Sequence, residues 1–572
     1  MNFESIRVFM GVSLFRRPNG TARSPKGRPQ CAATGVRKGS PPVSVFLSLV
    51  CTHPKHRQRT LPSRIHTPDP NGLRDQELYR HPGLPRAAEI IRHSSGQTFR
   101  LSTWTVSRSG LVYTFHLKKG ICFSNGDPLT TEDVVYSLNR VSSYDAGGPK
   151  GPAPYGSSYN DIVGYNAWFN DGKKPSASVK GMSSLTAPNP STVVIHLLQP
   201  QAYFLNELAL ESAAVLDPRV VEKYGVVPYQ LHAVGTGPYK LLYWHQNRQM
   251  VLVPNPFYNR PNPARMARVV FNVNVPFSTQ FLLFKEGKVD MIDLPDQGTY
   301  LSALGTPGMM QDFYKQATNE IWYFALNTSK PPFNKLDVRL AVNDAIDRTP
   351  DLRLINGLGS VMSQPLPPEM PGYEPSIKPY PYDPALAKKL LKKAGYPRGF
   401  TVTLVYTTGR PFVQNVAENI QSQLMKVGIH VILKNMASTG SFFSYTGDPK
   451  NPFEIAWSDW YQDYPDPEDF LFNLLDGQTI GSLNVAAWNN AKFNALVEKA
   501  DALPASQESE RLKLYDEAQK IAIAEAPWVP MFYPLQDAFV QPWVMPHNVN
   551  VFVHPVRAEN IQSMYLSSHL NG

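Results

Sequence analysis

Cysteine is scarce in this chain of 572 residues, which contains only three. Cys31 and Cys51 lie within the first hundred residues, so Cys122 stands alone in the remainder. A single cysteine excludes a disulfide framework built within that remainder, and no Cys-x-x-Cys pair is present for zinc or redox chemistry. We therefore expect Cys122, in the apolar stretch 121–123, to be a small buried hydrophobic side chain.

Long apolar runs are absent as well. No run approaches the roughly 18 apolar residues that a membrane-spanning helix needs. Hydrophobic residues make up 42% of the chain and charged residues 18%, which is typical of a globular protein. A chain of this length does not fold around one core, so we expect two or three lobes. The 53 prolines indicate many ordered turns.

Sequence signatures of catalysis are missing too. The 13 histidines are scattered and form no His-Glu-x-x-His pair, and neither a Gly-x-Ser-x-Gly elbow, a dinucleotide fingerprint nor a P-loop is present. Residues 235–238 (Gly-Thr-Gly-Pro) lack the Gly-Lys-Ser/Thr ending of a phosphate loop and precede a predicted strand, so we interpret them as a structural turn. We expect no catalytic residues, no metal ligands and no cofactor, and hence no enzyme.

Positive charge is confined to one end of the chain. Residues 1–100 hold 17 Lys and Arg against 5 Asp and Glu, whereas the rest holds 39 against 41. The main part therefore has no charge bias that indicates a polyanion, and we predict no nucleic-acid partner. Tryptophan shows the same division, because none of the nine tryptophans lies before Trp104.

The first hundred residues do not match the rest. Residues 16–40 are rich in Arg, Gly, Ser and Pro without helix or strand periodicity, which predicts disorder. The apolar run 43–50 before Cys51 resembles the hydrophobic region of an export signal, but it begins late and places bulky Val50 before the cleavage position. Three explanations compete: a basic tail, a diverged export leader, or a stretch translated in the wrong frame. The abrupt change in charge and tryptophan use favours the third.

Regular patterns begin near Trp104. Strands are predicted at 111–117 and 192–197, with a helix between them that Thr130 or Thr131 caps. Further along, Asp383-Pro384 begins a helix that Gly395 ends. A strand at 400–406, a helix at about 413–427 and a strand at 429–433 follow. This β-α-β alternation predicts an α/β lobe.

Four segments of this main part, taken together, resemble one known family. They are residues 104–137, which include Phe-Ser-Asn-Gly-Asp-Pro-Leu-Thr-Thr-Glu-Asp at 123–133; 235–240 with 255–258; 325–342; and 463–471, Asp-Tyr-Pro-Asp-Pro-Glu-Asp-Phe-Leu. In their order and separations they resemble the family 5 extracellular solute-binding proteins, which include the dipeptide and oligopeptide receptors of bacterial ABC importers. The similarity covers about residues 102–560. The family has an early strand and a ligand-facing loop before the first segment, and we find no counterpart for them in residues 1–100.

The resemblance implies an α/β fold of the periplasmic-binding-protein type II class. It has two main lobes and a smaller third lobe, with a ligand cleft between the main lobes, which close by hinge motion. The implied divisions are an atypical basic segment at 1–100, the small lobe at 101–200, the first main lobe at 201–317, the second main lobe at 318–526, and a C-terminal return to the first main lobe at 527–572.

The implied function is that of the substrate-binding protein of an ABC importer, at a periplasmic or an extracellular, membrane-associated location. We expect a monomer that captures peptides or similar amine-bearing solutes and delivers them to membrane permease subunits driven by a separate ATPase. Relatives also take up sugars, nickel complexes, haem or glutathione, so those ligands remain alternatives. An alternative of another class is an interaction protein whose basic N-terminal tail contacts nucleic acid or a membrane.

Asp463 is the leading candidate for ligand binding. The resemblance aligns it with the acidic residue that pairs with the ligand's α-amino group in peptide-binding relatives, and a carboxylate can hold an ammonium by a charge-assisted hydrogen bond. Trp457, Trp460 and Tyr461 flank this acidic loop, where aromatic faces can line a side-chain pocket. The alternatives are a solvated turn with Asp466 as a helix cap, and ordinary core packing of the aromatic residues.

Overall fold

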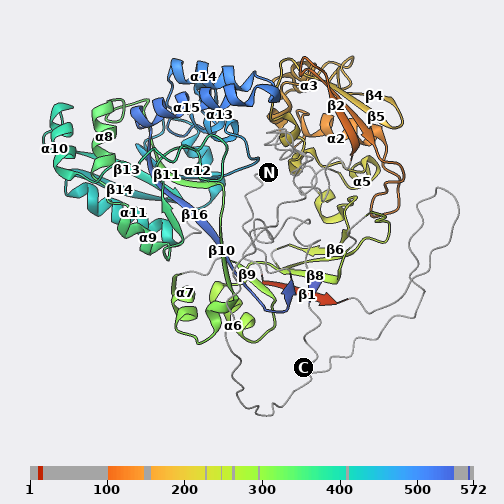
Figure 1. Ribbon diagram of the computed structural model, residues 1–572, viewed down its shortest axis with the longest axis horizontal. Helices are drawn as coiled ribbons and strands as arrows, with labels where there is room; N and C mark the ends of the chain where they lie inside the picture. The colour runs from red at the N-terminus through yellow and green to blue at the C-terminus, as the bar shows by residue number, and fades with distance from the viewer. Residues whose placement is uncertain are drawn as a thin grey trace, which may run out of the picture.

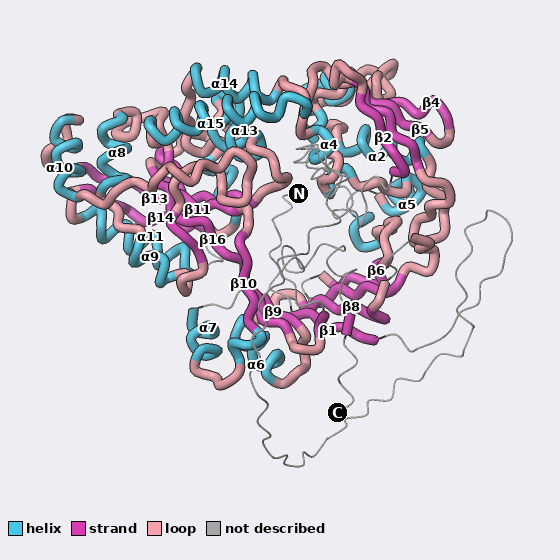
Figure 2. The backbone as a smooth tube through the Cα atoms, viewed as in Figure 1, coloured by secondary structure: helices cyan, strands magenta, loops and turns pink. Residues whose placement is uncertain are grey.

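The computed structural model describes residues 11–16, 101–146, 156–225, 228–246, 248–260, 264–293, 297–407, 411–545 and 565–566. Its strands form a large sheet of twelve strands, a four-stranded sheet and a two-stranded ribbon. Figures 1 and 2 show the four-stranded sheet apart from the large one, with helices packed on both. No helix among these residues is long and apolar enough to cross a membrane.

The small lobe is built on the four-stranded antiparallel sheet. The strand order is β2 (Leu101–Val106), β3 (Val112–Leu117), β5 (Thr192–His196) and β4 (Thr186–Asn189). Helix α2 (Thr131–Val141) begins at Thr130, whose side chain accepts from the N–H of Asp133 while the Asp133 carboxylate accepts from the N–H of Thr130. This capping box confirms the predicted helix start. The hydrophobic core of the lobe continues through residues 204–215, so its packing extends past residue 200.

The large sheet joins both main lobes. Its order is β14 (Ile429–Met436), β13 (Phe400–Thr407), β15 (Ile455–Tyr461), β11 (Glu320–Leu326), β16 (Trp528–Val540), β9 (Met291–Asp293), β1 (Gly11–Arg16), β8 (Met266–Asn272), β7 (Gln249–Pro254) and β6 (Tyr239–His245), with β10 (Phe313–Ala317) and β12 (Gly359–Val361) also paired to β16. β13 lies parallel to β14 and to β15. The predicted β-α-β unit is confirmed as β13, α11 (Pro411–Met425) and β14.

Helices pack around these sheets and complete the α/β architecture. The helices after α2 are α3 (Tyr165–Phe169), α4 (Phe204–Glu207), α5 (Pro218–Tyr224), α6 (Phe277–Lys285), α7 (Gln297–Leu304), α8 (Leu336–Asp344), α9 (Thr349–Leu354), α10 (Pro384–Lys393), α12 (Thr439–Thr446), α13 (Glu468–Leu475), α14 (Ala491–Asp501) and α15 (Glu508–Glu525). α10 begins as predicted, because Asp383 accepts from the N–H of Leu386 at 2.8 Å and Pro384 occupies the first turn. Two hydrophobic clusters, one on each face of the β11–β15 sheet region, form the core of the second main lobe.

Strand β16 runs through both main lobes. Its first half pairs with β11 and β12, and its second half pairs with β10 and β9. β10 ends at Ala317 and β11 begins at Glu320, so a second passage between the lobes lies beside it. Strand segments that cross between two lobes in this way are the positions where a hinge closes. Figure 1 shows β10 and β16 connecting the helix-rich lobe to the sheet that contains β9, β1 and β8.

A strand from the N-terminal segment lies inside the large sheet. β1 pairs antiparallel with β8 from Gly11↔Asn272 to Arg16↔Met266, and its first residues also pair with β9. The expectation that residues 1–100 hold no counterpart of an early strand was therefore wrong. Six residues provide too little periodicity to stand out from a basic, proline-rich surrounding. The disorder predicted beyond Arg16 and the export-like run 43–50 fall outside the described residues.

Cys122 is buried as expected but is not unpaired. Its side chain is buried, with 5% exposed, as predicted for a small hydrophobic residue. It is also disulfide-bonded. The prediction of an unpaired cysteine was therefore wrong.

Candidate ligand-binding site

Three of the four predicted site residues lie on β15. The antiparallel register places Trp457 opposite Phe324 and Tyr461 opposite Glu320. Trp457 is only 3% exposed, and its ring lies 5.1 Å from that of Phe324 in an edge-to-face arrangement. This geometry favours the core-packing alternative for Trp457. Trp460 and Tyr461 are half-buried at the end of the strand.

The end of β15 is tied to the passage between the main lobes. The N–H of Gln462 donates to the carbonyl of Asn319 at 2.9 Å, and the Asn319 amide donates to Gln462 Oε1 at 2.6 Å. Asn319 lies in the two-residue link between β10 and β11. Asp463 follows directly, half-buried. Asp463 therefore lies beside the segments that connect the two main lobes.

Asp469 holds the Asp463 loop in place, a role that the sequence did not reveal. Asp469 Oδ2 accepts from the N–H of Asp463 at 2.8 Å and from Trp460 Nε1 at 3.3 Å. The side chain is fully buried at the start of α13. Burial, with the nearby charges of Asp463 and Glu468, raises the pKa of Asp469 well above its ordinary range. Asp469 therefore positions the loop and the indole, while Asp463 remains the carboxylate that is partly open to solvent.

Asp466 behaves as the helix-cap alternative predicted. Its Oδ1 accepts from the N–H of Glu468 at 3.1 Å in the first turn of α13, although Pro467 occupies the N-cap position itself. The same carboxylate forms a buried, two-pronged ion pair with Arg511, at 2.9 and 3.2 Å. Both carboxylate oxygens are thereby engaged, so Asp466 is a structural residue.

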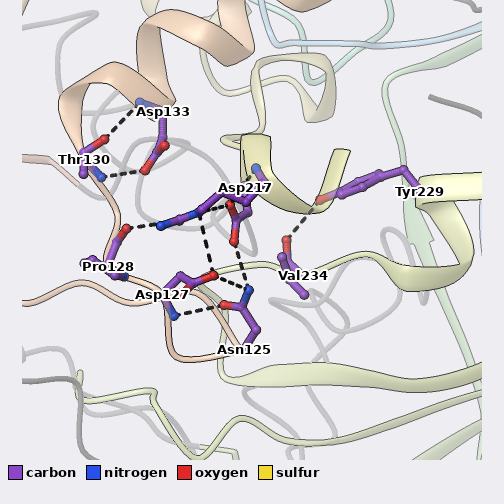
Figure 3. A network of polar contacts seen from close by, with 9 residues as sticks. Asn125, Asp127, Pro128, Thr130, Asp133, Asp217, Tyr229 and Val234 are labelled. Carbon is purple, nitrogen blue, oxygen red and sulfur yellow. Dashed lines mark hydrogen bonds and ion pairs between the residues drawn. The ribbon is translucent and has the colours of Figure 1, made fainter. Parts of the chain in front are cut away.

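Two of the four family-like segments meet at the joint between the small lobe and α5. Asn125 Nδ2 donates to Asp217 Oδ2 at 2.9 Å, and Arg219 Nε donates to Asp217 Oδ1 at 2.6 Å (Figure 3). Asp217 caps α5 through the N–H of Arg219. Burial alone would raise the pKa of Asp217, but the hydrogen bonds from Arg219 and Asn125 outweigh it and lower that pKa.

The same turn contacts the second segment directly. The N–H of Ser124 donates to the carbonyl of Gly235 at 2.9 Å. Gly126 has φ of +100°, and a Cβ there would lie 2.9 Å from Cζ of Phe257. Only glycine satisfies both the backbone conformation and the close approach. Residues 123–133, 235–240 and 255–258 therefore contact one another in a single joint.

The described residues contain no group of three or more His, Cys, Asp or Glu side chains arranged to hold a metal ion. A small cavity does lie within the second main lobe, lined by Ser363, Gln364, Tyr380 and Trp528 among others. None of the four predicted ligand-binding side chains lines this cavity. The candidate site is instead the loop at the end of β15.

Comparisons with known proteins agree with this arrangement. The sequence pattern described as bacterial extracellular solute-binding proteins, family 5 Middle, matches residues 101–482. Heme-binding protein A of Haemophilus influenzae is 30% identical over 459 residues, which cover 77% of this chain and 80% of that protein. Glutathione-binding protein GsiB of Escherichia coli K12 is 27% identical over 442 residues, 75% of this chain and 79% of that protein.

A solved structure gives the same result for the fold. It is the ABC transporter-associated periplasmic binding protein DppA from Helicobacter pylori in complex with the peptide STSA, with a TM-score of 0.69 and 27% identity. The alignment covers 84% of this chain and 93% of that one. This confirms the predicted fold class, and the family pattern spans well over half of the chain. The chain belongs to the bacterial extracellular solute-binding proteins of family 5.

Proposed function

We propose that this protein captures peptides or similar amine-bearing solutes between its two main lobes and delivers them to the permease of an ABC importer. The observation that carries the proposal is Asp463, a half-buried carboxylate held at the lobe passage by the Asp469 anchor. An ammonium held there gains a charge-assisted hydrogen bond in partly desolvated surroundings. Trp460 and Tyr461 lie beside it and supply aromatic surface for the adjoining part of the ligand.

Closure of the two main lobes around the solute precedes its delivery to the permease. A ligand that contacts both main lobes favours the closed form by its extra affinity for that form. We place the lobes at residues 101–200, 201–317 and 318–526, with 527–572 returning to the first main lobe. In this proposal the protein acts as a monomer in the periplasm or at the outer face of the membrane, and a separate ATPase drives transport. It binds its solute without chemical change.

What two relatives bind, according to their names, is consistent with peptide binding by this protein. The H. pylori protein was solved with a tetrapeptide, and GsiB is named for glutathione, a peptide-like molecule with a free amine. Haem is the second candidate ligand, because a relative at 30% identity is named a heme-binding protein. The two candidates differ in chemistry: a peptide presents an ammonium to Asp463, whereas haem presents carboxylates that this residue would repel.

Calorimetry on the full chain tests the amine role. With trialanine as the probe, Asp463→Ala should weaken binding by about 1.5–3 kcal/mol, the scale of a hydrogen bond to a charged group. N-acetyl-trialanine, which lacks the ammonium, should bind weakly to the wild type and equally to the variant. Glu510→Ala removes an exposed carboxylate from the same lobe and serves as the matched control.

The outcomes separate the candidates. An unchanged dissociation constant in Asp463→Ala would remove Asp463 from the site. A thermal-shift screen of peptides, cello-oligosaccharides, nickel chelates and haem then fixes the ligand class, because binding to the native state alone raises the melting temperature. Stabilisation by haem alone would retain the receptor function and replace the peptide with the second candidate.

A further inference from the structure

The small lobe also contacts the second main lobe. The rings of Tyr203, just before α4, and Tyr464, just before α13, stack with centroids 6.1 Å apart and planes 5° from parallel. Nearby, a Cβ at Gly110 in the β2–β3 turn would lie 3.5 Å from Cβ of Pro504. In Figure 1, α13 and α14 face the small lobe. Tyr464 follows Asp463, so this contact adjoins the candidate ligand site.

Carboxyl groups from both sides are buried together at this contact. Glu207 is the last residue of α4, which packs in the small-lobe core, and the half-buried Asp161 lies on the same side. From the other side, Glu468 begins α13, Asp466 lies two residues before it, and Asp501 ends α14. Glu207 is 6% exposed, and its Oε2 accepts no hydrogen bond within the described part of the chain. The charges that act on it are, in order, those of Glu468, Asp161, Asp466 and Asp501.

The remaining polar groups here do not balance these carboxyls. Arg511 on α15 is the cation that the described residues place in this cluster, and it is already paired with Asp466. Gln201 donates to Asp161, Tyr464 donates to Glu468, and Tyr515 donates to Asp501. The other phenols that feel the Glu207 charge are Tyr113, Tyr159 and Tyr203. Within the described part of the chain, Glu207 Oε2 has neither a cation nor a hydrogen-bond donor.

A carboxyl group that is buried without a partner is neutral. Taking a carboxylate out of water without a partner costs several kcal/mol, so the group binds a proton instead. Burial, together with Glu468, raises the pKa of Glu207 well above its ordinary value of 4.5. Burial likewise raises the pKa of Glu468 to about 8.

We propose that the contact between the small lobe and the second main lobe is a proton-dependent latch, closed when Glu207 and Glu468 are protonated and released when they ionise. When the lobes separate, water reaches both carboxyls and their affinity for protons falls. Closure therefore takes up protons from solvent, and opening returns them. This latch acts in the same way whichever solute the receptor binds.

The direction of the pH effect follows from linkage. The closed form has the higher carboxyl pKa, so the latch is at full strength below the ordinary value of 4.5 and weakens as pH rises toward about 8. Within that window the ratio of closed to open molecules should fall about tenfold per pH unit for each proton released. Solute affinity, which requires the closed form, should fall in parallel.

Small-angle scattering of the ligand-free full chain from pH 5 to 9 tests the latch. The wild type should expand as pH rises. Glu207→Gln and Glu468→Gln, neutral mimics of the protonated groups, should each reduce the pH dependence, and the double variant should remain compact across the range. Glu222→Gln on α5 removes an exposed carboxylate and should behave as the wild type does.

Several results would overturn the proposal. One is an equal expansion with pH in Glu207→Gln and wild type. Another is a midpoint that moves with sodium concentration at constant ionic strength, which would assign the neutralising role to an inorganic cation. If Glu207→Gln does not fold, hydrogen exchange at Tyr464 in the wild type decides: protection should fall as pH rises beyond the intrinsic rate change, and constant protection contradicts the latch.

Discussion

The small lobe contacts its two neighbours through joints of opposite electrostatic character. At the first joint, Arg219 faces Asp217 and Asp127 beside the Asn125 amide, and the pKa of Asp217 is lowered. At the second, Glu207 Oε2 accepts no hydrogen bond from the described residues, and the pKa of Glu207 is raised. A buried carboxylate that is hydrogen-bonded to a cation stays ionised at physiological pH, whereas one without a donor is stable in the contact only while it is protonated. The first joint is therefore a permanent attachment, and the second is one that pH can release.

The largest effect should come from removing the cation of the second joint. Arg511→Met leaves the Asp466 carboxylate buried without its partner, which should lower the free energy of unfolding by about 3–5 kcal/mol. Urea denaturation at pH 7 measures this loss. Lys520→Met breaks the exposed Lys520–Asp516 pair and is the control, with an expected change within about 0.5 kcal/mol. Equal losses in the two variants would mean that Arg511 does not balance the cluster.

A smaller effect is expected at the first joint, with the opposite pH dependence. Asp217→Asn keeps a capping oxygen but removes the charge, and it should cost about 1 kcal/mol at pH 7. Because the pKa of Asp217 is lowered, its contribution is complete above the ordinary value of 3.8 and disappears as pH falls through the lowered pKa. Unfolding curves of wild type and variant should therefore converge in acid. A gap that stays constant with pH would contradict the charge-based account of this joint.

The smallest effect should come from the outer carboxylate of the first joint. Arg219 Nε lies 3.7 Å from Asp127 Oδ2, and both side chains are nearly half exposed. Asp127→Asn should change the free energy of unfolding by less than about 0.5 kcal/mol, and 1 M salt should abolish the difference. A loss as large as that of Asp217→Asn would show that the exposed pair, rather than the buried cap, holds the joint.

Local features of this chain were predictable, whereas its long-range pairings were not. The caps at Thr130 and Asp383 and the β-α-β unit at 400–436 depend on residues a few positions apart, and the structure confirms them. β1 was missed because its place depends on pairing with β8, more than 250 residues away.

The candidate site likewise has some features that local sequence predicts and others that depend on tertiary structure. Placing Asp463, Trp460 and Tyr461 at one strand end followed from their adjacency in the sequence. The burial of Trp457 depends on Phe324 and Trp322 across the sheet, which no local pattern reveals. Glu207 and Glu468 likewise come close together only in the tertiary structure. Each of these two glutamates, viewed along its own helix, would be taken as an ordinary polar residue.

The position of β16 in the chain has a consequence for biosynthesis. All four of its neighbours, β9, β10, β11 and β12, are made before it, and β16 itself begins only at Trp528 of 572 residues. Until this strand leaves the ribosome, sheets of both main lobes carry open edges of the kind that recruit other chains into aggregates. The sheet that the two main lobes share is therefore completed only near the end of synthesis.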